Sequence, residues 1–173
     1  MKKEITIEDY NPNWSKQFDE EKEKLKEILT DKYISIEHIG STSVEGLCAK
    51  PILDIAIGVN DLEIVSEFIE PLKQIGYEFV YHKEFPQRRF FRKGQWGSGT
   101  HHIHFYQYHG EHWNNQILFR NYLRVNPDVL KEYQKLKINL AEKFRFDRAS
   151  YTTNKAPFIQ NVLQKAKEEN EQK

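Results

Sequence analysis

The hydrophobic pattern of the first third of the chain predicts one helix followed by two strands. Five apolar residues share one face of a helix over residues 12–29, with Asn11-Pro12 as its capping signal: Trp14, Phe18, Leu25, Ile28 and Leu29. Alternation of apolar and polar residues predicts a strand over residues 34–39. A nearly continuous apolar run over residues 52–59, interrupted by Asp54, predicts a buried strand that carries one carboxylate.

The remaining pattern predicts more strands and then a helical C-terminal third. A helix is expected over residues 61–75, with Pro71 as the place for a kink and Gly76 as the stop. Strands are expected at 77–81, 88–92 and 102–108, and helices at 113–125, at 127–144 and from about 154. The charged segment 165–173 is expected to fray. We therefore predict an α/β (α+β) protein in which residues 1–173 form a single domain, a mixed sheet flanked by helices.

Composition limits where in the cell the protein is expected and which binding partners it is expected to have. Lys plus Arg and Asp plus Glu each number 26, so the formal net charge is zero and gives no support for general nucleic-acid binding or for an anionic membrane surface. No stretch approaches the ~18 apolar residues of a membrane span, and the N-terminus lacks the apolar run of a secretory signal. The single cysteine excludes an intrachain disulfide. These features lead us to expect a cytoplasmic protein.

The loop between the first two predicted strands carries the candidate chemistry. Gly40-Ser41-Thr42-Ser43 directly follows a strand, and Lys50 comes later in the same loop. Glycine permits a tight turn and close approach of a ligand, and backbone N–H groups with hydroxyls can bind phosphate. Asp54 follows on the next strand, where a carboxylate could hold a hard cation. Hydroxyl residues after a strand also serve simply to satisfy a turn, so the spacing leaves a binding role and a structural role open.

The same segment resembles the signature of a known family. Residues 37–55, which include Glu37-His38, Gly40-Ser41 and Asp54, resemble the GrpB family, and so do His102-Ile103-His104, residues 118–124, Tyr133 with Lys137, and Tyr151 with Lys155. The resemblance spans nearly the whole chain and implies the nucleotidyltransferase fold. It implies an activity only loosely, because the biochemical function of the family is largely undefined. In some bacteria a similar domain is fused to dephospho-coenzyme A kinase.

One departure from active nucleotidyltransferases bears on catalysis. Active members of this fold carry Asp-x-Asp or Asp-x-Glu on the strand after Gly-Ser and a third acid on a later strand, and these carboxylates hold two Mg²⁺ ions. Asp54 fills the first position, but Ala56 stands at the second, and the later strand carries His102 and His104 in place of an acid. The two-metal clamp cannot form from these strands, so nucleotidyl transfer is doubtful.

The histidines admit two interpretations. His102 and His104 share one face of their strand, and imidazole suits Zn²⁺, Mn²⁺, Fe²⁺ or Ni²⁺ better than Mg²⁺. In the first interpretation Asp54, His102 and His104, with His38 as a further candidate ligand, bind a divalent cation, Mg²⁺ or Mn²⁺ being expected before Zn²⁺. In the second, the more common role for such residues, they form a hydrogen-bonded floor in which Asp54 favours protonated imidazole. Glu37 and His38 are then supporting residues.

Basic residues on the C-terminal helices could complete a site for phosphate. Arg120 and Arg124 lie at i, i+4, as do Tyr133 and Lys137, and we expect the three basic side chains to neutralise a ligand. Tyr151 and Lys155 repeat the spacing with weaker support. The alternative for each residue is a solvated helix face.

The leading hypothesis is a nucleotidyltransferase-like protein that binds a nucleotide or another phosphorylated small molecule. Ser41, Thr42, Ser43 and Lys50 would hold phosphate, and Asp54, His102 and His104 would be the candidate catalytic residues. The alternatives are a non-catalytic ligand-binding or interaction domain, and a metal-dependent hydrolase that uses His102 and His104.

Overall fold

A computed structural model describes residues 2–173. It contains five α-helices, five strands and two 3₁₀ helices within that range. In chain order they are α1 (Asn13–Leu29), β1 (Ser35–Ile39), η1 (Ser41–Ser43), β2 (Leu53–Val59), η2 (Leu62–Phe68), α2 (Ile69–Gln74), β3 (Tyr77–Val80), β4 (Arg88–Lys93), β5 (His101–Gln107), α3 (Glu111–Val125), α4 (Pro127–Lys143) and α5 (Arg148–Glu171).

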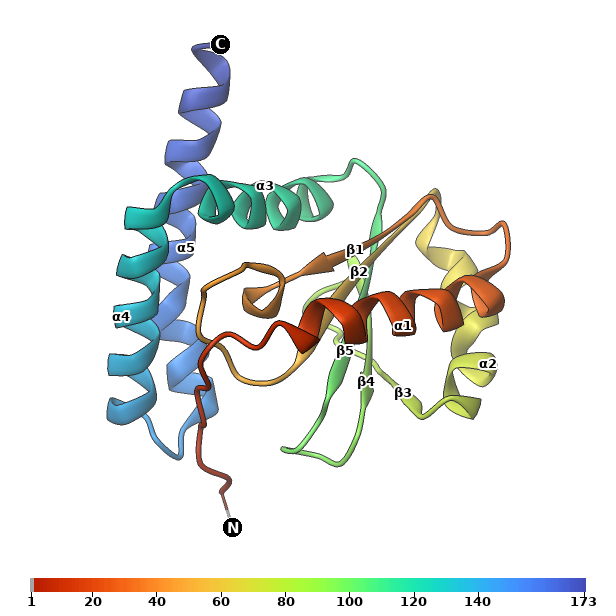
Figure 1. The fold of residues 1–173 in the computed structure, drawn as a ribbon. Helices are drawn as coiled ribbons and strands as arrows, with labels where there is room; N and C mark the ends of the chain where they lie inside the picture. Colours follow the sequence, from red (N-terminus) through yellow and green to blue (C-terminus); the bar gives the residue numbers. More distant parts are fainter. Residues whose placement is uncertain (1) are drawn as a thin grey trace.

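The strands form one mixed sheet in the order β1-β2-β5-β4-β3 (Figure 1). β2 runs parallel to β5, and the other neighbouring strands are antiparallel. The register places Asp54 between Ile39 and His102, and it places Ala56 beside His104. The mixed sheet with flanking helices confirms the predicted fold class.

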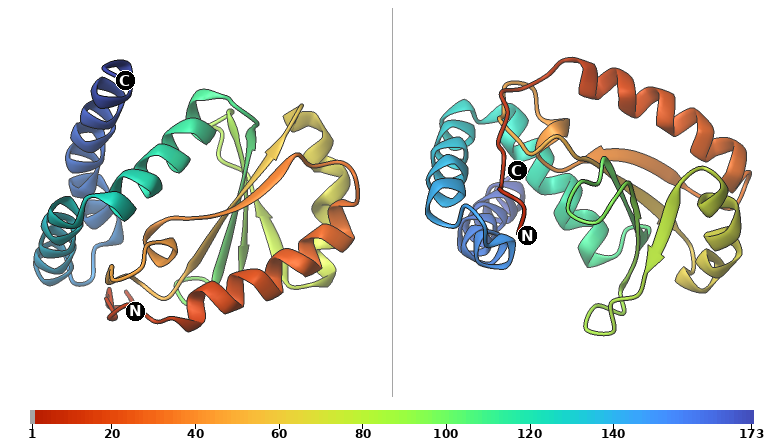
Figure 2. Two further views of the ribbon diagram at one scale, coloured as in Figure 1. Left: turned by 45° about the horizontal axis from the view of Figure 1, so that its top comes forward. Right: turned by 90° about the horizontal axis from the view of Figure 1, so that it is seen from below.

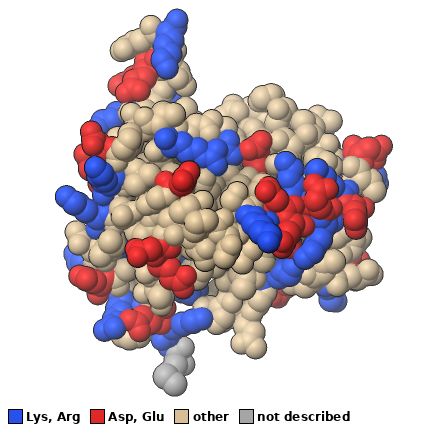
Figure 3. All heavy atoms as spheres, viewed as in Figure 1, with Lys and Arg blue, Asp and Glu red and all other residues tan. Residues whose placement is uncertain are grey.

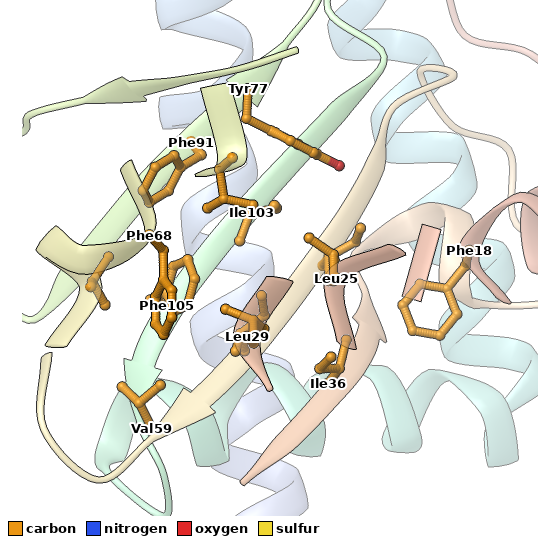
Figure 4. Close-up of a cluster of buried hydrophobic side chains, with 14 residues drawn as sticks. Phe18, Leu25, Leu29, Ile36, Val59, Phe68, Tyr77, Phe91, Ile103 and Phe105 are labelled. Atoms are coloured by element: carbon orange, nitrogen blue, oxygen red, sulfur yellow. The ribbon is translucent and has the colours of Figure 1, made fainter. Parts of the chain in front are cut away.

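One face of the sheet is apolar and is covered by α1, η2 and α2. Figure 4 shows Leu25 and Leu29 of α1 directed at the sheet, where they join Ile36, Ile103 and Phe105 in the largest buried cluster. Burying each such side chain stabilises the fold by about 1.5–3 kcal/mol. The predicted apolar face of α1 is therefore confirmed, because Trp14, Phe18, Leu25 and Leu29 are all buried.

The opposite face of the sheet is polar over part of its area. Because side chains alternate along a strand, Asp54, His102 and His104 project to this face. Figure 2 shows α3 running along this side and α4 and α5 standing together at one end of the sheet. Val44 and Leu47 of the loop after η1 pack against Leu123 and Tyr133 of these helices. The loop that carries the candidate site therefore lies between the sheet and the C-terminal helices.

Two predicted helices differ from those observed. The single helix expected over 61–75 is wrong, because the chain forms the 3₁₀ helix η2 and then α2, with Pro71 in the first turn of α2 where its missing N–H needs no partner. The last helix begins at Arg148 instead of near Asn154, because the Asp147 side chain accepts a hydrogen bond from the Ser150 N–H.

The charged segment 165–173, for which we expected fraying, continues α5 as a helix to Glu171. Two contacts hold this end of the helix. The Tyr122 hydroxyl donates to Glu169 at 2.9 Å, and Ala166 is buried beside Tyr122.

Charged side chains of both signs are interspersed on the face that carries α1 and α4 (Figure 3). In residues 2–173, no helix has both the length and the apolar character needed to cross a membrane.

Candidate functional site

Gly40 brings the loop into contact with Asp54. Its φ of 71° lies in the region that favours glycine, and a Cβ added there would lie 2.7 Å from Asp54 Oδ2. The hydroxyl of Ser43 donates to the Gly40 carbonyl at 2.5 Å, and that of Thr42 donates to the Ile52 carbonyl at 3.2 Å. These two hydroxyls are therefore used inside the loop, which is the structural role that the sequence left open.

Two imidazoles converge on one oxygen of Asp54. His104 Nε2 lies 2.9 Å from Asp54 Oδ1, and His102 Nδ1 lies 3.4 Å from the same oxygen. Within residues 2–173, Asp54, His102 and His104 form the one group of three potential metal ligands, with donor atoms within 4.8 Å of one another. The structure thus brings together the three residues that the sequence singled out as candidate catalytic residues.

The ionisation of this group differs from the expectation. Burial alone would raise the pKa of Asp54, but hydrogen bonds from His102 and His104 outweigh it and hold that pKa below its ordinary value. Burial lowers the pKa of His104, while the hydrogen bond and the charge of Asp54 oppose that shift, so the net direction is opposite to the favoured protonated imidazole that the sequence led us to expect. A neutral His104 with its proton on Nε2 would donate the 2.9 Å hydrogen bond to the Asp54 carboxylate.

Beside Asp54 lies a small cavity that we call the lysine cavity. Its volume is about 120 Å³, and it is lined by Ser41, Thr42, Ala49, Lys50, Ile52, Asp54, His102, Lys137, Tyr151 and Lys155. Lys50 and Lys155 both place Nζ over the ring of Tyr151, at 5.0 and 4.6 Å from its centroid. Lys137 donates to the Cys48 carbonyl at 2.5 Å and lies 5.2 Å from the ring centroid of Tyr133. The nearest contacts of these amines are thus a backbone carbonyl and aromatic faces, while the Asp54 carboxylate lies elsewhere in the lining of the same cavity.

The three lysines have no carboxylate partner. Among the ion pairs of residues 2–173, none involves Lys50, Lys137 or Lys155. Burial and then the charge of Lys155 lower the pKa of Lys137 to about 7, and burial and then Lys50 lower the pKa of Lys155 to about 8. Burial and then Arg148 lower the pKa of Lys50. A bound anion would favour the charged amines, so anion binding here would be coupled to proton uptake.

The structure does not bring Arg120 and Arg124 into the lysine cavity. Arg120 Nη1 donates to Glu37 at 2.7 Å and to the His38 carbonyl at 2.9 Å. Arg124 donates twice to the Ser43 carbonyl, at 2.7 and 3.2 Å. Both side chains therefore hold the end of β1 and η1 against α3, and their expected role in neutralising a ligand inside this cavity has no geometric support.

His38 supports the loop from the apolar side of the sheet. Its ring stacks on Phe18 at 4.8 Å between centroids, and its Nε2 lies 2.9 Å from the Thr42 hydroxyl. Burial lowers the pKa of His38 to about 4. His38 is not part of the Asp54 group of potential metal ligands, so its geometry fits the supporting role better than the ligand role.

Lys155 and Tyr151 are closer to the candidate site than their weak support from the sequence indicated. Each lines the lysine cavity as directly as Lys137 does. A signal was present, because Tyr151 and Lys155 repeat the i, i+4 spacing of Tyr133 and Lys137, and in both pairs the amine lies over the ring. The repeated pair indicates that two neighbouring helices present lysines to one point.

Comparison with known proteins identifies the family. The family model described as "GrpB protein" matches residues 4–165. This chain belongs to the GrpB family. Glutamate-rich protein GrpB from Alkalihalophilus pseudofirmus is 39% identical over 166 residues, which cover 94% of this chain and 95% of that protein. The crystal structure of conserved protein GrpB from Enterococcus faecalis has a TM-score of 0.88 at 37% identity and covers 95% of this chain and 99% of that one.

This chain also matches part of three longer proteins, covering less than half of each. A Dephospho-CoA kinase from Mycobacterium bovis is 26% identical over 183 residues, 90% of this chain but 44% of that protein. UPF0157 protein YqkA from Bacillus subtilis is 39% identical, and this chain spans 48% of its length. The Cid1 poly(U) polymerase bound to MgATP has a TM-score of 0.52 at 16% identity over 78% of this chain and 44% of that one. At that identity the likeness shows the nucleotidyltransferase-like fold alone.

The residues present do not fit the two Mg²⁺ ions of active nucleotidyltransferases. Ala56 is fully buried and packs with Ile39, Tyr106 and Trp113, so its position offers neither an oxygen ligand nor room for one. The group around Asp54 supplies two ring nitrogens, whereas Mg²⁺ demands octahedral oxygen coordination. A two-metal clamp therefore cannot be built from β2 and β5.

Proposed function

We propose that this protein binds a phosphorylated small molecule, a nucleotide being the class favoured by the fold, with its phosphate in the lysine cavity. The proposal rests on the convergence of Lys50, Lys137 and Lys155 on one cavity, in which the Asp54 carboxylate is engaged by His102 and His104 and none of the three lysines forms an ion pair within residues 2–173. Like charges that are partly or fully buried together are costly unless an anion compensates them.

The size of the cavity limits what it encloses. Sites that bury a whole drug-sized ligand measure about 300–1,000 Å³, whereas the lysine cavity measures about 120 Å³. We infer that only the phosphate portion enters, between the lysines and Ser41, and that the rest of the ligand lies outside. Asp54 and His102 line the same cavity, where the Asp54 carboxylate would accept a hydrogen bond from a ligand hydroxyl and the His102 ring could donate to a phosphate oxygen.

The proposal is for binding without Mg²⁺-dependent nucleotidyl transfer. The packed Ala56 and the absence of a second carboxylate in the Asp54 group support this part of it. Incubation with ATP and Mg²⁺ should release no pyrophosphate above background. Robust release would contradict the proposal and would point to an acid recruited from another segment, such as Glu37.

A binding experiment tests the site directly. We expect the thermal midpoint of unfolding to rise with pyrophosphate, ATP or dephospho-coenzyme A. The last ligand is included because one relative is a dephospho-CoA kinase. A ligand at 100 times its Kd stabilises the folded state by about 2.7 kcal/mol. Ser41→Ala combined with Lys50→Ala should abolish the shift, whereas Lys135→Ala, exposed on α4 near Lys137, should preserve it. An equal shift in the double variant, or no response to any of these ligands, would show that the lysine cavity is not the site.

A further inference from the structure

We propose that Asp54, His102 and His104 form a binding site for one divalent transition-metal ion of the Zn²⁺ or Mn²⁺ class, and that this site discriminates against Mg²⁺. The inference deepens the proposed function, because it names the cation that would stand beside the phosphate. It does not depend on phosphate binding for its test.

The donor atoms already lie near coordination geometry. In a tetrahedral site the ion lies about 2.0–2.1 Å from each nitrogen or oxygen, which sets neighbouring donor atoms about 3.3 Å apart. Asp54 Oδ1 lies 3.4 Å from His102 Nδ1 and 2.9 Å from His104 Nε2. These two separations differ from that spacing by a few tenths of an ångström, and all three donor atoms lie within 4.8 Å of one another, so side-chain rotation has to bring the two ring nitrogens onto one ion.

The scaffold holds these donors in register. β2 and β5 are central strands of the sheet, and Asp54 and His102 are direct neighbours in their parallel pairing. Sites built on paired strands are positioned more precisely than sites on loops. Two imidazoles and one carboxylate suit Zn²⁺, Mn²⁺ or Fe²⁺, whereas Mg²⁺ prefers oxygen ligands in an octahedron.

Hydrogen bonding alone explains the arrangement less fully. Both imidazoles approach the same oxygen, Oδ1, while Oδ2 lies against Gly40. His104 Nδ1 is buried without a partner. If Nε2 binds an ion, the ring proton lies on Nδ1, so a metal-loaded site predicts that this atom gains an acceptor such as water. A single cation between the two ring nitrogens and the carboxylate would be bound by all three side chains, whose donor atoms lie within 4.8 Å of one another.

The coordination sphere remains open toward the lysine cavity. Asp54 and His102 both line that cavity, so water or a phosphate oxygen could occupy the next position. The nearby lysines repel a cation until an anion neutralises them. We therefore expect metal to bind more tightly in the presence of pyrophosphate than in its absence.

Metal uptake by the full chain tests the inference. Protein treated with chelator is dialysed against Zn²⁺, Co²⁺, Mn²⁺ or Mg²⁺, and the bound metal is measured by mass spectrometry, with the visible spectrum of Co²⁺ reporting its ligands. We expect one Zn²⁺ or Co²⁺ per chain and no retained Mg²⁺. His102→Ala, at the more exposed histidine (29% exposed against 12% for His104), should weaken binding by more than about 100-fold, since loss of an outer-shell partner alone costs up to that much.

His101→Ala is the matched control. His101 immediately precedes His102 on β5 and faces Glu21 on the other side of the sheet, so its loss should not affect metal binding. Substoichiometric uptake, equal affinity for Mg²⁺, or undiminished binding by folded His102→Ala would overturn the inference. Pyrophosphate titrated without metal separates the two proposals: phosphate binding without metal uptake refutes the metal site alone, and metal uptake without phosphate binding refutes the proposed function alone.

Discussion

Replacing Gly40 with alanine tests the contact that positions Asp54. Gly40 has φ 71° and ψ −175°, a region that only glycine adopts readily and that costs another residue about 1–3 kcal/mol. The new Cβ would lie 2.7 Å from Asp54 Oδ2 and 3.0 Å from Asp54 Cβ. Overpacking of this kind adds about 1–3 kcal/mol, so Gly40→Ala should lower the free energy of unfolding by about 4 kcal/mol in all.

Gly46 provides a control in the same loop. Its φ is 83°, but nothing lies within 4 Å of an added Cβ. Gly46→Ala therefore imposes backbone strain without the contact, and we expect it to cost about 1–2 kcal/mol. The difference between the two variants measures the clash with Asp54.

Urea unfolding followed by circular dichroism gives both free energies. A double-mutant cycle sharpens the result, because Asp54→Ala removes Oδ2 and should reduce the cost of Gly40→Ala by about 1 kcal/mol or more. Equal losses for Gly40→Ala and Gly46→Ala would refute the contact. So would an unchanged cost of Gly40→Ala in the Asp54→Ala background.

Three further predictions concern buried ionisable groups. Burial holds the pKa of His38 at about 4. The free energy of unfolding should therefore be independent of this group above the unfolded pKa of about 6.5, and it should fall by about 3 kcal/mol as the pH drops to 4. His38→Gln should reduce that loss in urea titrations across pH. Glu21→Gln should cost about 3 kcal/mol in chemical unfolding, because Glu21 is buried and accepts hydrogen bonds from Tyr77 and Lys93; exposed Glu20→Gln should cost almost nothing. Lys137→Met should raise the thermal midpoint of unfolding at neutral pH, because burial penalises the charged amine. The same variant should weaken pyrophosphate binding in calorimetry. A lower midpoint would show that the hydrogen bond to the Cys48 carbonyl outweighs the cost of burying the charge.

Short-range sequence patterns predicted which strand residues form the candidate site, but they did not predict which groups the helix arginines contact. Period-two alternation placed His102 and His104 on one face, and the family resemblance placed that face near Asp54; both agree with the structure. The i, i+4 spacing correctly put Arg120 and Arg124 on one helix face. It carries no information on what that face meets, and the structure shows that it meets the Glu37 carboxylate and two backbone carbonyls.

Local patterns in the sequence were enough to predict the fold class, most helix and strand bounds and the departure at Ala56, because hydrophobic periodicity and residue identity are local properties. Only the tertiary structure shows which lysine side chains line the same cavity. Lys50, Lys137 and Lys155 come from a loop and two helices far apart in the chain, and only the packing of α4 and α5 against the loop after η1 brings their amines to one cavity. The direction of the pKa shift of His104 likewise depends on tertiary structure, because burial comes from neighbours that no spacing in the sequence specifies.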